Sequence, residues 1–212
     1  MPERELTAQK LLIAGMHLFG DLGFKGTTTR MIADKAGANI GSIAYYFGNK
    51  QGLYIAIARE INTRLTEKLK LDHMPSPDAL SPDQIQKEIT HFLHRLVDLF
   101  AADKEAEQWL MFVQREQISP SEAFDELYQN AFHSAHSFLS QLIARFCQLP
   151  NDNRKAILQT HLLIGQVIFL LTGRTPLLRR LNLQQKQLSQ DTIDDVKIIL
   201  ESHIRTLPLK SA

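Results

Sequence analysis

The side chains best suited to binding chemistry lie close together between Thr27 and Lys50. Small residues such as Gly41 and Ser42 let a short helix enter the major groove of DNA closely. Hydroxyl groups such as that of Tyr45, and an ammonium at a helix N-terminus, bind phosphate oxygens. The competing interpretation is an ordinary helical hairpin with half-buried tyrosines. The candidate DNA-binding residues are Thr28, Thr29, Arg30, Asn39, Ile40, Gly41, Ser42, Ala44, Tyr45, Tyr46 and Lys50.

Two histidine pairs, His91 with His94 and His133 with His136, have the three-residue spacing that places side chains on one helix face. Each pair is suited to one metal ion, although two polar residues at a helix edge explain it more simply. Glu88 and His91 imitate half of a di-iron carboxylate motif, which requires a second Glu-x-x-His sequence that this chain lacks. We therefore expect neither a metal site nor a cofactor.

Polar residues inside strongly apolar helices are the best candidates for a small-molecule pocket, because such pockets have apolar walls with a few polar groups. Gln114, Arg115 and Glu116 follow an apolar cluster, and His161 and Gln166 interrupt the most apolar helix. An internal Arg–Glu pair or a salt bridge at a helix end is the simpler alternative. The candidate pocket residues are Trp109, Phe112, Gln114, Arg115, His161 and Gln166.

Catalysis finds no support in the sequence, which has no Gly-x-Ser-x-Gly, Walker or dinucleotide loop and no Cys-x-x-Cys pair. The single Cys147 cannot form an internal disulfide, which fits a reducing cytoplasm. Nothing near the start has the pattern of an export signal. The longest apolar run, Leu162 to Leu171, is about half of the roughly 20 residues that a membrane-spanning helix needs. We expect a cytoplasmic protein that is neither an enzyme nor membrane-bound.

Two short helices at a sharp turn must position the candidate DNA-binding residues. Thr28 is suited to cap a helix over 29–36, since its hydroxyl can accept an early backbone N–H. Gly37 permits the turn, and Asn39 is suited to cap the next helix, over 40–46. The pattern is that of a helix-turn-helix.

Apolar residues at helical spacing fill the rest of the chain, and no strand pattern is present, so the fold class is all-α. Ser81 and Ser119, each followed by proline, are predicted N-caps. The prolines between 75 and 82 suggest a boundary between a three-helix DNA-binding domain over 1–50, linked by helix 50–71, and a larger C-terminal domain over 72–212. The other predicted helices span 6–20, 82–102, 104–117, 120–148, 153–172 and 190–207.

The helix over 153–172 is apolar on every face from Leu162 to Leu171. A helix without a polar face must be covered on all sides. The chain's own core can cover one side, and a second copy is the simplest cover for the other. We therefore expect a homodimer through this helix and the helix over 190–207.

The charge distribution agrees with a nucleic-acid partner at one end of the chain. The net charge is only +1, but residues 1–70 hold ten Lys and Arg against six Asp and Glu. Residues 71–212 hold fourteen against seventeen. The basic excess thus coincides with the predicted helix-turn-helix, where attraction to phosphates requires it.

These residues resemble the DNA-binding domain of the TetR family of bacterial transcriptional regulators, over about 6–57. Ala44 stands where many members carry a tyrosine, and Ala38-Asn39 where many have Val-Ser. The run from Ala38 to Lys50, with Gln114 to Pro120, resembles the CecR-type branch, which is associated with responses to antibiotics and toxic compounds. The matching positions are Thr27, Thr28, Ile32, Ala33, Ala36, Gly37, Gly41, Tyr45, Phe47, Lys50 and Leu53, after a helix ending in Leu18, Phe19 and Gly23.

The resemblance implies a homodimer that places two recognition helices in successive major grooves of a palindromic operator. It also implies an effector pocket in the C-terminal domain, backbone contacts from Thr28, Tyr45, Tyr46 and Lys50, and approach to bases by Asn39 to Ala44. The expected function is that of a repressor released by a small molecule. Two other hypotheses stay open: a helical metal-binding or enzymatic bundle, and a DNA-binding protein without an effector.

Overall fold

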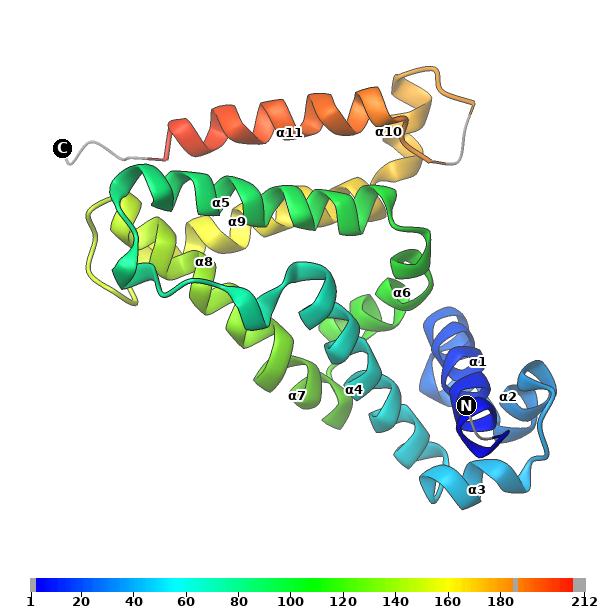
Figure 1. The fold of residues 1–212 in the computed structure, drawn as a ribbon. Helices are drawn as coiled ribbons and strands as arrows, with labels where there is room; N and C mark the ends of the chain where they lie inside the picture. Colours follow the sequence, from blue (N-terminus) through cyan, green and yellow to red (C-terminus); the bar gives the residue numbers. More distant parts are fainter. Residues whose placement is uncertain (1–2, 185–186, 208–212) are drawn as a thin grey trace. The chain divides into compact units, whose positions relative to one another are not determined.

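The structure is a computed structural model that describes residues 3–184 and 187–207, within which all regular secondary structure is helical (Figure 1). The predicted all-α class is confirmed. The α-helices are α1 (Glu3–Gly26), α2 (Thr29–Ala36), α3 (Gly41–Phe47), α4 (Lys50–Leu69), α5 (Pro82–Val97), α6 (Lys104–Ile118), α7 (Glu122–Leu127), α8 (His133–Phe146), α9 (Arg154–Thr172), α10 (Arg174–Arg180) and α11 (Gln190–Arg205). Four short turns complete the helical structure: η1 (Leu71–His73), η2 (Pro77–Ala79), and the π-helical η3 (Asp98–Ala102) and η4 (Tyr128–Phe132).

The chain divides into two compact units. The first unit comprises Met1–Leu65 and Lys104–Ala131, and the second unit comprises Thr66–Asp103 and Phe132–Ala212. Helices α6 and α7 therefore pack with the N-terminal helices, although they follow them by many residues in the chain. The predicted functional domains, 1–50 and 72–212 joined by helix 50–71, stay a prediction.

Local capping determines the geometry of the helix-turn-helix, as the sequence predicts. The Thr28 hydroxyl accepts the N–H of Met31 at 3.2 Å and caps α2. Gly37 ends α2 with a positive φ of 61°, which glycine adopts without strain. Helix α3 begins one residue later than predicted, and its N-cap is Ile40 instead of the predicted Asn39, whose side-chain oxygen accepts the N–H of Gly41 at 2.8 Å.

Aromatic side chains link three helices of the first unit. The Tyr54 ring from α4 packs edge-on against Phe19 from α1, with centroids 4.8 Å apart, and lies 4.6 Å from Phe112 of α6. Helix α4 buries the apolar residues that recur every four positions along it, from Leu53 to Leu69. Helix α3 is held on this core by Ile43, which is 2% exposed.

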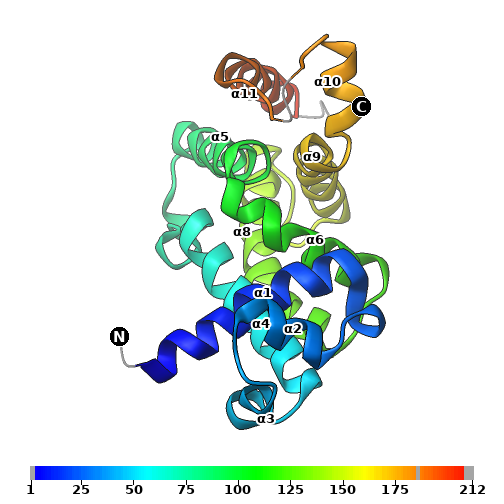
Figure 2. The ribbon, with the colours of Figure 1, turned by 90° about the vertical axis from the view of Figure 1, so that its right-hand side faces the viewer.

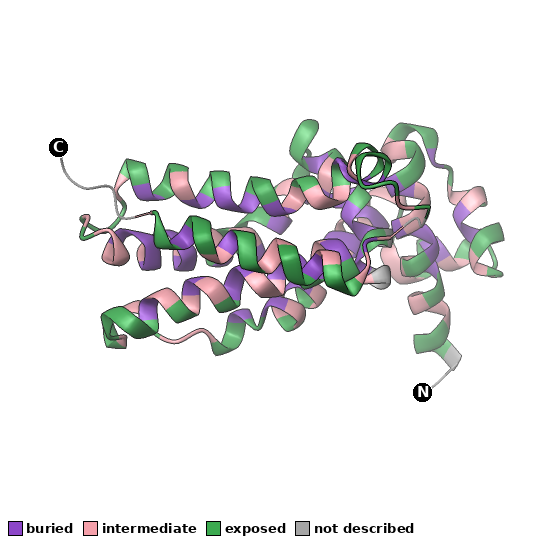
Figure 3. Ribbon diagram, turned by 90° about the horizontal axis from the view of Figure 1, so that it is seen from above, coloured by how far each residue is buried: buried purple, intermediate pink, exposed green. Residues whose placement is uncertain are grey.

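The second unit is a bundle in which α5 contacts α8, α9 and α11 (Figures 1 and 2). Its first helix begins with the capping predicted at Ser81, completed by Gln84 in a reciprocal capping box. Phe92 and Phe138 face each other in the core, with ring centroids 5.9 Å apart. Figure 3 shows exposed residues alternating with buried ones along these helices, as amphipathic helices require.

The predicted helix start at Ser119-Pro120 is wrong. Helix α7 begins at Glu122, and its N-cap is Ser121, whose hydroxyl accepts the N–H of Ala123 at 3.2 Å. The reason is the Glu116 carboxylate at the end of α6, which accepts both the N–H and the hydroxyl of Ser121, at 3.0 and 2.8 Å. Local capping rules do not include this carboxylate.

Candidate nucleic-acid interface

Helix α3 presents a continuous exposed side opposite the buried Ile43. Tyr45 is 62% exposed and Ile40 is 53% exposed, and Gly41 and Ala44 are also exposed. These candidate residues therefore lie on the outer side of the helix, whereas their contact with DNA stays a prediction. Of the other candidates, Thr28, Arg30 and Asn39 are exposed, and Thr29, Ser42, Tyr46 and Lys50 are half-buried.

The exposed aromatic residue of α3 is held in place by two neighbours. The Tyr46 ring packs edge-on against Tyr45, with centroids 4.9 Å apart. The guanidinium of Arg4, in the first turn of α1, donates a hydrogen bond to the Tyr45 hydroxyl. Arg4 is not among the residues predicted from the sequence, because no local pattern connects residues 41 positions apart.

Lys50 contacts the protein's own backbone. Its ammonium donates a hydrogen bond to the carbonyl of Phe24 at 2.6 Å and lies 4.2 Å from the centroid of the Phe24 ring. Burial lowers the pKa of Lys50. Because an ammonium has three donors, Lys50 can donate to a phosphate as well as to Phe24.

A Lys50→Ala variant should distinguish these roles. Loss of a charged hydrogen bond to Phe24 should lower the free energy of unfolding by about 1.5–3 kcal/mol. If Lys50 also binds a phosphate, the slope of log K against log salt for DNA binding should become shallower by about 0.9. Urea unfolding and DNA titrations at several salt concentrations measure the two effects. An unchanged slope would contradict the phosphate contact.

Four candidate pocket residues lie on α6 in the first unit. Trp109 and Phe112 are fully buried, and Gln114 is half-buried. Arg115 donates to the carbonyls of Gly20 and Asp21, each at 2.5 Å, and so caps an end within α1. This contact resembles the simpler alternative, a structural interaction of Arg115 at a helix end, more than it resembles a ligand contact. Positive charge is favourable where a helix leaves carbonyls unpaired.

Glu116 is the centre of a buried polar network in the first unit. It is 3% exposed, and its carboxylate accepts the Tyr54 hydroxyl at 2.6 Å in addition to its two bonds from Ser121. Burial and the hydrogen bond to Glu116 both raise the pKa of Tyr54. The carboxylate thus joins α4, α6 and the start of α7.

The other two pocket candidates, His161 and Gln166, are exposed on α9 in the second unit. The Gln166 side-chain oxygen lies 3.2 Å from Nδ1 of His203 on α11, and the His161 ring lies 6.2 Å from that of His136. Burial lowers the pKa of His136, and the neighbouring histidines lower it further. Within the described residues, no three His, Cys, Asp or Glu side chains form a group suited to a metal ion.

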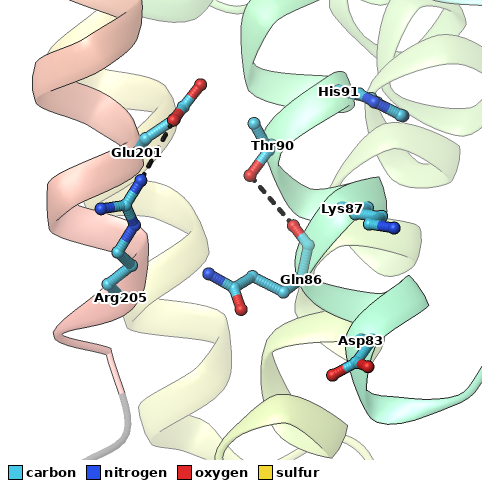
Figure 4. A pocket seen from close by; sticks show the side chains of 7 residues that line it. All are labelled: Asp83, Gln86, Lys87, Thr90, His91, Glu201 and Arg205. Carbon is cyan, nitrogen blue, oxygen red and sulfur yellow. Dashed lines mark hydrogen bonds and ion pairs between the residues drawn. The ribbon is translucent and has the colours of Figure 1, made fainter.

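A polar groove of about 380 Å³ lies between α5 and α11 in the second unit (Figure 4). Glu201 lies 3.4 Å from both Arg205 and His94, so this acidic side chain already has partners within the protein. The candidate pocket residues do not line this groove. The lining residues are Asp83, Gln86, Lys87, Thr90, His91, Glu201 and Arg205.

Comparison with known proteins identifies two regions of the chain. Residues 11–57 match the model of the bacterial regulatory proteins of the tetR family, and residues 85–209 match the C-terminal domain of the HTH-type transcriptional dual regulator CecR. The CecR protein of Shigella flexneri is 32% identical over 184 residues, which cover 83% of this chain and 80% of that protein.

Solved structures show the same fold. A TetR-like transcriptional regulator from Rhodococcus sp. RHA1 has a TM-score of 0.61 at 19% identity, covering 97% of this chain and 96% of the other. AibR, solved with isovaleryl coenzyme A and operator DNA, has a TM-score of 0.66 at 12% identity, covering 95% and 98%. The chain therefore belongs to the TetR family of bacterial transcriptional regulators and carries a C-terminal domain of the CecR type, which confirms the resemblance noted in the sequence.

Proposed function

We propose that this regulator is a repressor that binds a palindromic operator as a dimer and leaves it when a small molecule binds. The observation that carries the proposal is the exposed side of α3, where Gly41, Ala44 and Tyr45 lie opposite the buried Ile43. A short helix with small exposed residues can lie in a major groove with its backbone near the base edges. Thr28, Tyr45 and Tyr46 then bind phosphates, and Asn39 to Ala44 approach the bases.

The two copies meet through α9 and α11. Leu162 and Phe169 on α9 and Ile198 on α11 are 64–66% exposed. A second copy that covers these large apolar side chains would remove them from water, which is favourable. Helix α9 is also long and apolar enough to span a membrane, with mean hydropathy 1.4 and 28% of the segment buried. The exposed His161 and Gln166 on the same helix favour a protein partner over lipid.

The effector binds near Trp109, whose buried indole N–H has no hydrogen-bond acceptor among the described residues. A buried donor of this kind requires a partner, which an effector oxygen would provide. The ligand of AibR makes acyl-coenzyme A one class of effector to test. The effector must have a higher affinity for the form of the dimer that does not fit the operator than for the form that does. A ligand with equal affinity for both forms does not shift the equilibrium between them. The proposal includes no catalytic step.

An Ala44→Glu variant tests the role of α3. The side chain is exposed, so glutamate is compatible with folding, but it places a negative charge on the side that enters the groove of the negatively charged DNA. Like charges at an interface cost several kcal/mol, so operator affinity should fall at least about 100-fold. The wild-type protein first selects operator sequences from a random DNA library, and footprinting locates its binding site on them. Titration of this DNA with the variant then measures the loss of affinity.

Ala102→Glu is the matched control, since Ala102 is also exposed but lies at the end of η3 in the second unit. It should bind DNA like the wild type. Equal operator affinities for the wild type and both variants would contradict the proposal that α3 contacts DNA. A wild-type protein that selects no DNA sequence would overturn the proposed function itself.

A further inference from the structure

The first turn of α1 lies against the exposed side of α3. Arg4 Nη2 donates a hydrogen bond to the Tyr45 hydroxyl, and the guanidinium carbon lies 5.5 Å from the centroid of the Tyr45 ring. Both side chains are exposed, Tyr45 to 62%. Contacts between exposed groups contribute little to the stability of a fold. The arrangement therefore has little value for folding and places a cation at the candidate interface.

The direction of this hydrogen bond leaves the phenol able to donate. Because the Tyr45 oxygen accepts from Arg4, its own O–H can donate to a third group. A hydroxyl that accepts a charge-assisted hydrogen bond is polarised, which strengthens the bond it donates. The guanidinium has further N–H groups in a planar fork that matches the oxygens of a phosphate.

We propose that Arg4 is a further DNA-binding residue, which contacts the same backbone phosphate as Tyr45 and orients the Tyr45 hydroxyl toward it. The inference rests on the proposed function and extends the interface from α2 and α3 to the start of α1. Its ligand is a phosphodiester beside the major groove that α3 enters. Since a phosphate contact carries no sequence information, Arg4 adds affinity without base preference.

Operator titrations of Arg4→Ala across a range of salt concentrations test the inference. We expect affinity to fall about tenfold, and the slope of log K against log salt to become shallower by about 0.9, the value for one lost phosphate contact. Arg4→Gln keeps a donor for Tyr45 but loses the charge, so it should show the same slope change with a smaller loss of affinity. The unfolding temperature should stay unchanged in both variants, because Arg4 is exposed.

The link through Tyr45 has its own measurement. Tyr45→Phe removes the hydroxyl without removing charge, so affinity should fall while the slope stays the same. In the double variant, Arg4→Ala with Tyr45→Phe, the loss should be smaller than the product of the two single losses, because Arg4 acts partly through that hydroxyl. A loss equal to the product would overturn the orienting role of Arg4.

Arg59→Ala is the matched control for charge, since the Arg59 guanidinium lies 3.3 Å from the Glu126 carboxylate on α7. It should change neither affinity nor slope. If it flattens the slope as much as Arg4→Ala does, the effect is general electrostatics and the inference is wrong. Normal binding by Arg4→Ala would also overturn it while leaving the proposed function intact. A wild-type protein that binds no operator would overturn both.

Discussion

A variant with glutamate at both Leu162 and Phe169 should be a monomer and should lose specific DNA binding. The two side chains are 66% and 65% exposed on α9, so a single subunit can fold without them. A dimer through α9 would instead have to bury their unpaired carboxylates, which costs several kcal/mol. One DNA-binding unit alone retains little more than non-specific affinity, so the operator Kd should rise at least about 1,000-fold. Sedimentation at micromolar concentration and operator titration measure the two effects.

Leu181→Glu is the control, because Leu181 is 45% exposed at the end of α10 in the same unit. It should remain a dimer with normal affinity. A double variant that still sediments as a dimer would contradict the interface through α9. If the wild type instead co-sediments with lipid vesicles, and the double variant does not, α9 meets a membrane.

Hydrogen-bonding rules that act within a few residues made the helix starts predictable. Thr28 and Ser81 each accept a backbone N–H close in sequence and cap a helix, as predicted. The buried face of α4 was predictable for a similar reason, since helical spacing places its apolar residues on one side. These features need no knowledge of the rest of the fold.

Prediction failed where a side chain outside the local capping pattern decides the structure. Ser119 satisfies the local rules for an N-cap, but Glu116 holds Ser121 instead. In the same way, the placement of Arg4 on Tyr45 depends on the packing of α1 against α3, which no spacing in the sequence encodes. The start of α7 and the N-terminal part of the interface were therefore beyond sequence reasoning.

The break in α1 explains why Arg115 and Lys50, which were predicted to bind a ligand and DNA, contact the protein's own backbone. Gly23 leaves the helical conformation with φ 73°, so carbonyls of the preceding turn lose their helical partners. Thr27 donates to the carbonyls of Leu18 and Gly23, both at 2.9 Å. Arg115 and Lys50 satisfy the neighbouring carbonyls of Gly20, Asp21 and Phe24. The sequence shows that cations are present, but not which carbonyls they will meet.

Replacing Glu116 with alanine should lower the free energy of unfolding by about 3–5 kcal/mol. Each hydrogen bond to its carboxylate contributes about 1.5–3 kcal/mol, and the bond from Tyr54 is shielded from water. Tyr54 is 4% exposed, so its hydroxyl would lose its acceptor without gaining a water molecule. Urea unfolding should show a lower midpoint with an unchanged m value.

Tyr54→Phe shows how much of this loss comes from the orphaned hydroxyl. Alone it removes one hydrogen bond and leaves both Ser121 contacts, so it should cost about 1.5–3 kcal/mol. Combined with Glu116→Ala, it removes the hydroxyl that would otherwise stay buried without an acceptor. The double variant should therefore lose less stability than the two single variants together. Strictly additive losses would mean that the Tyr54 hydroxyl finds another acceptor, and that Glu116 stabilises the unit through Ser121 and the start of α7 alone.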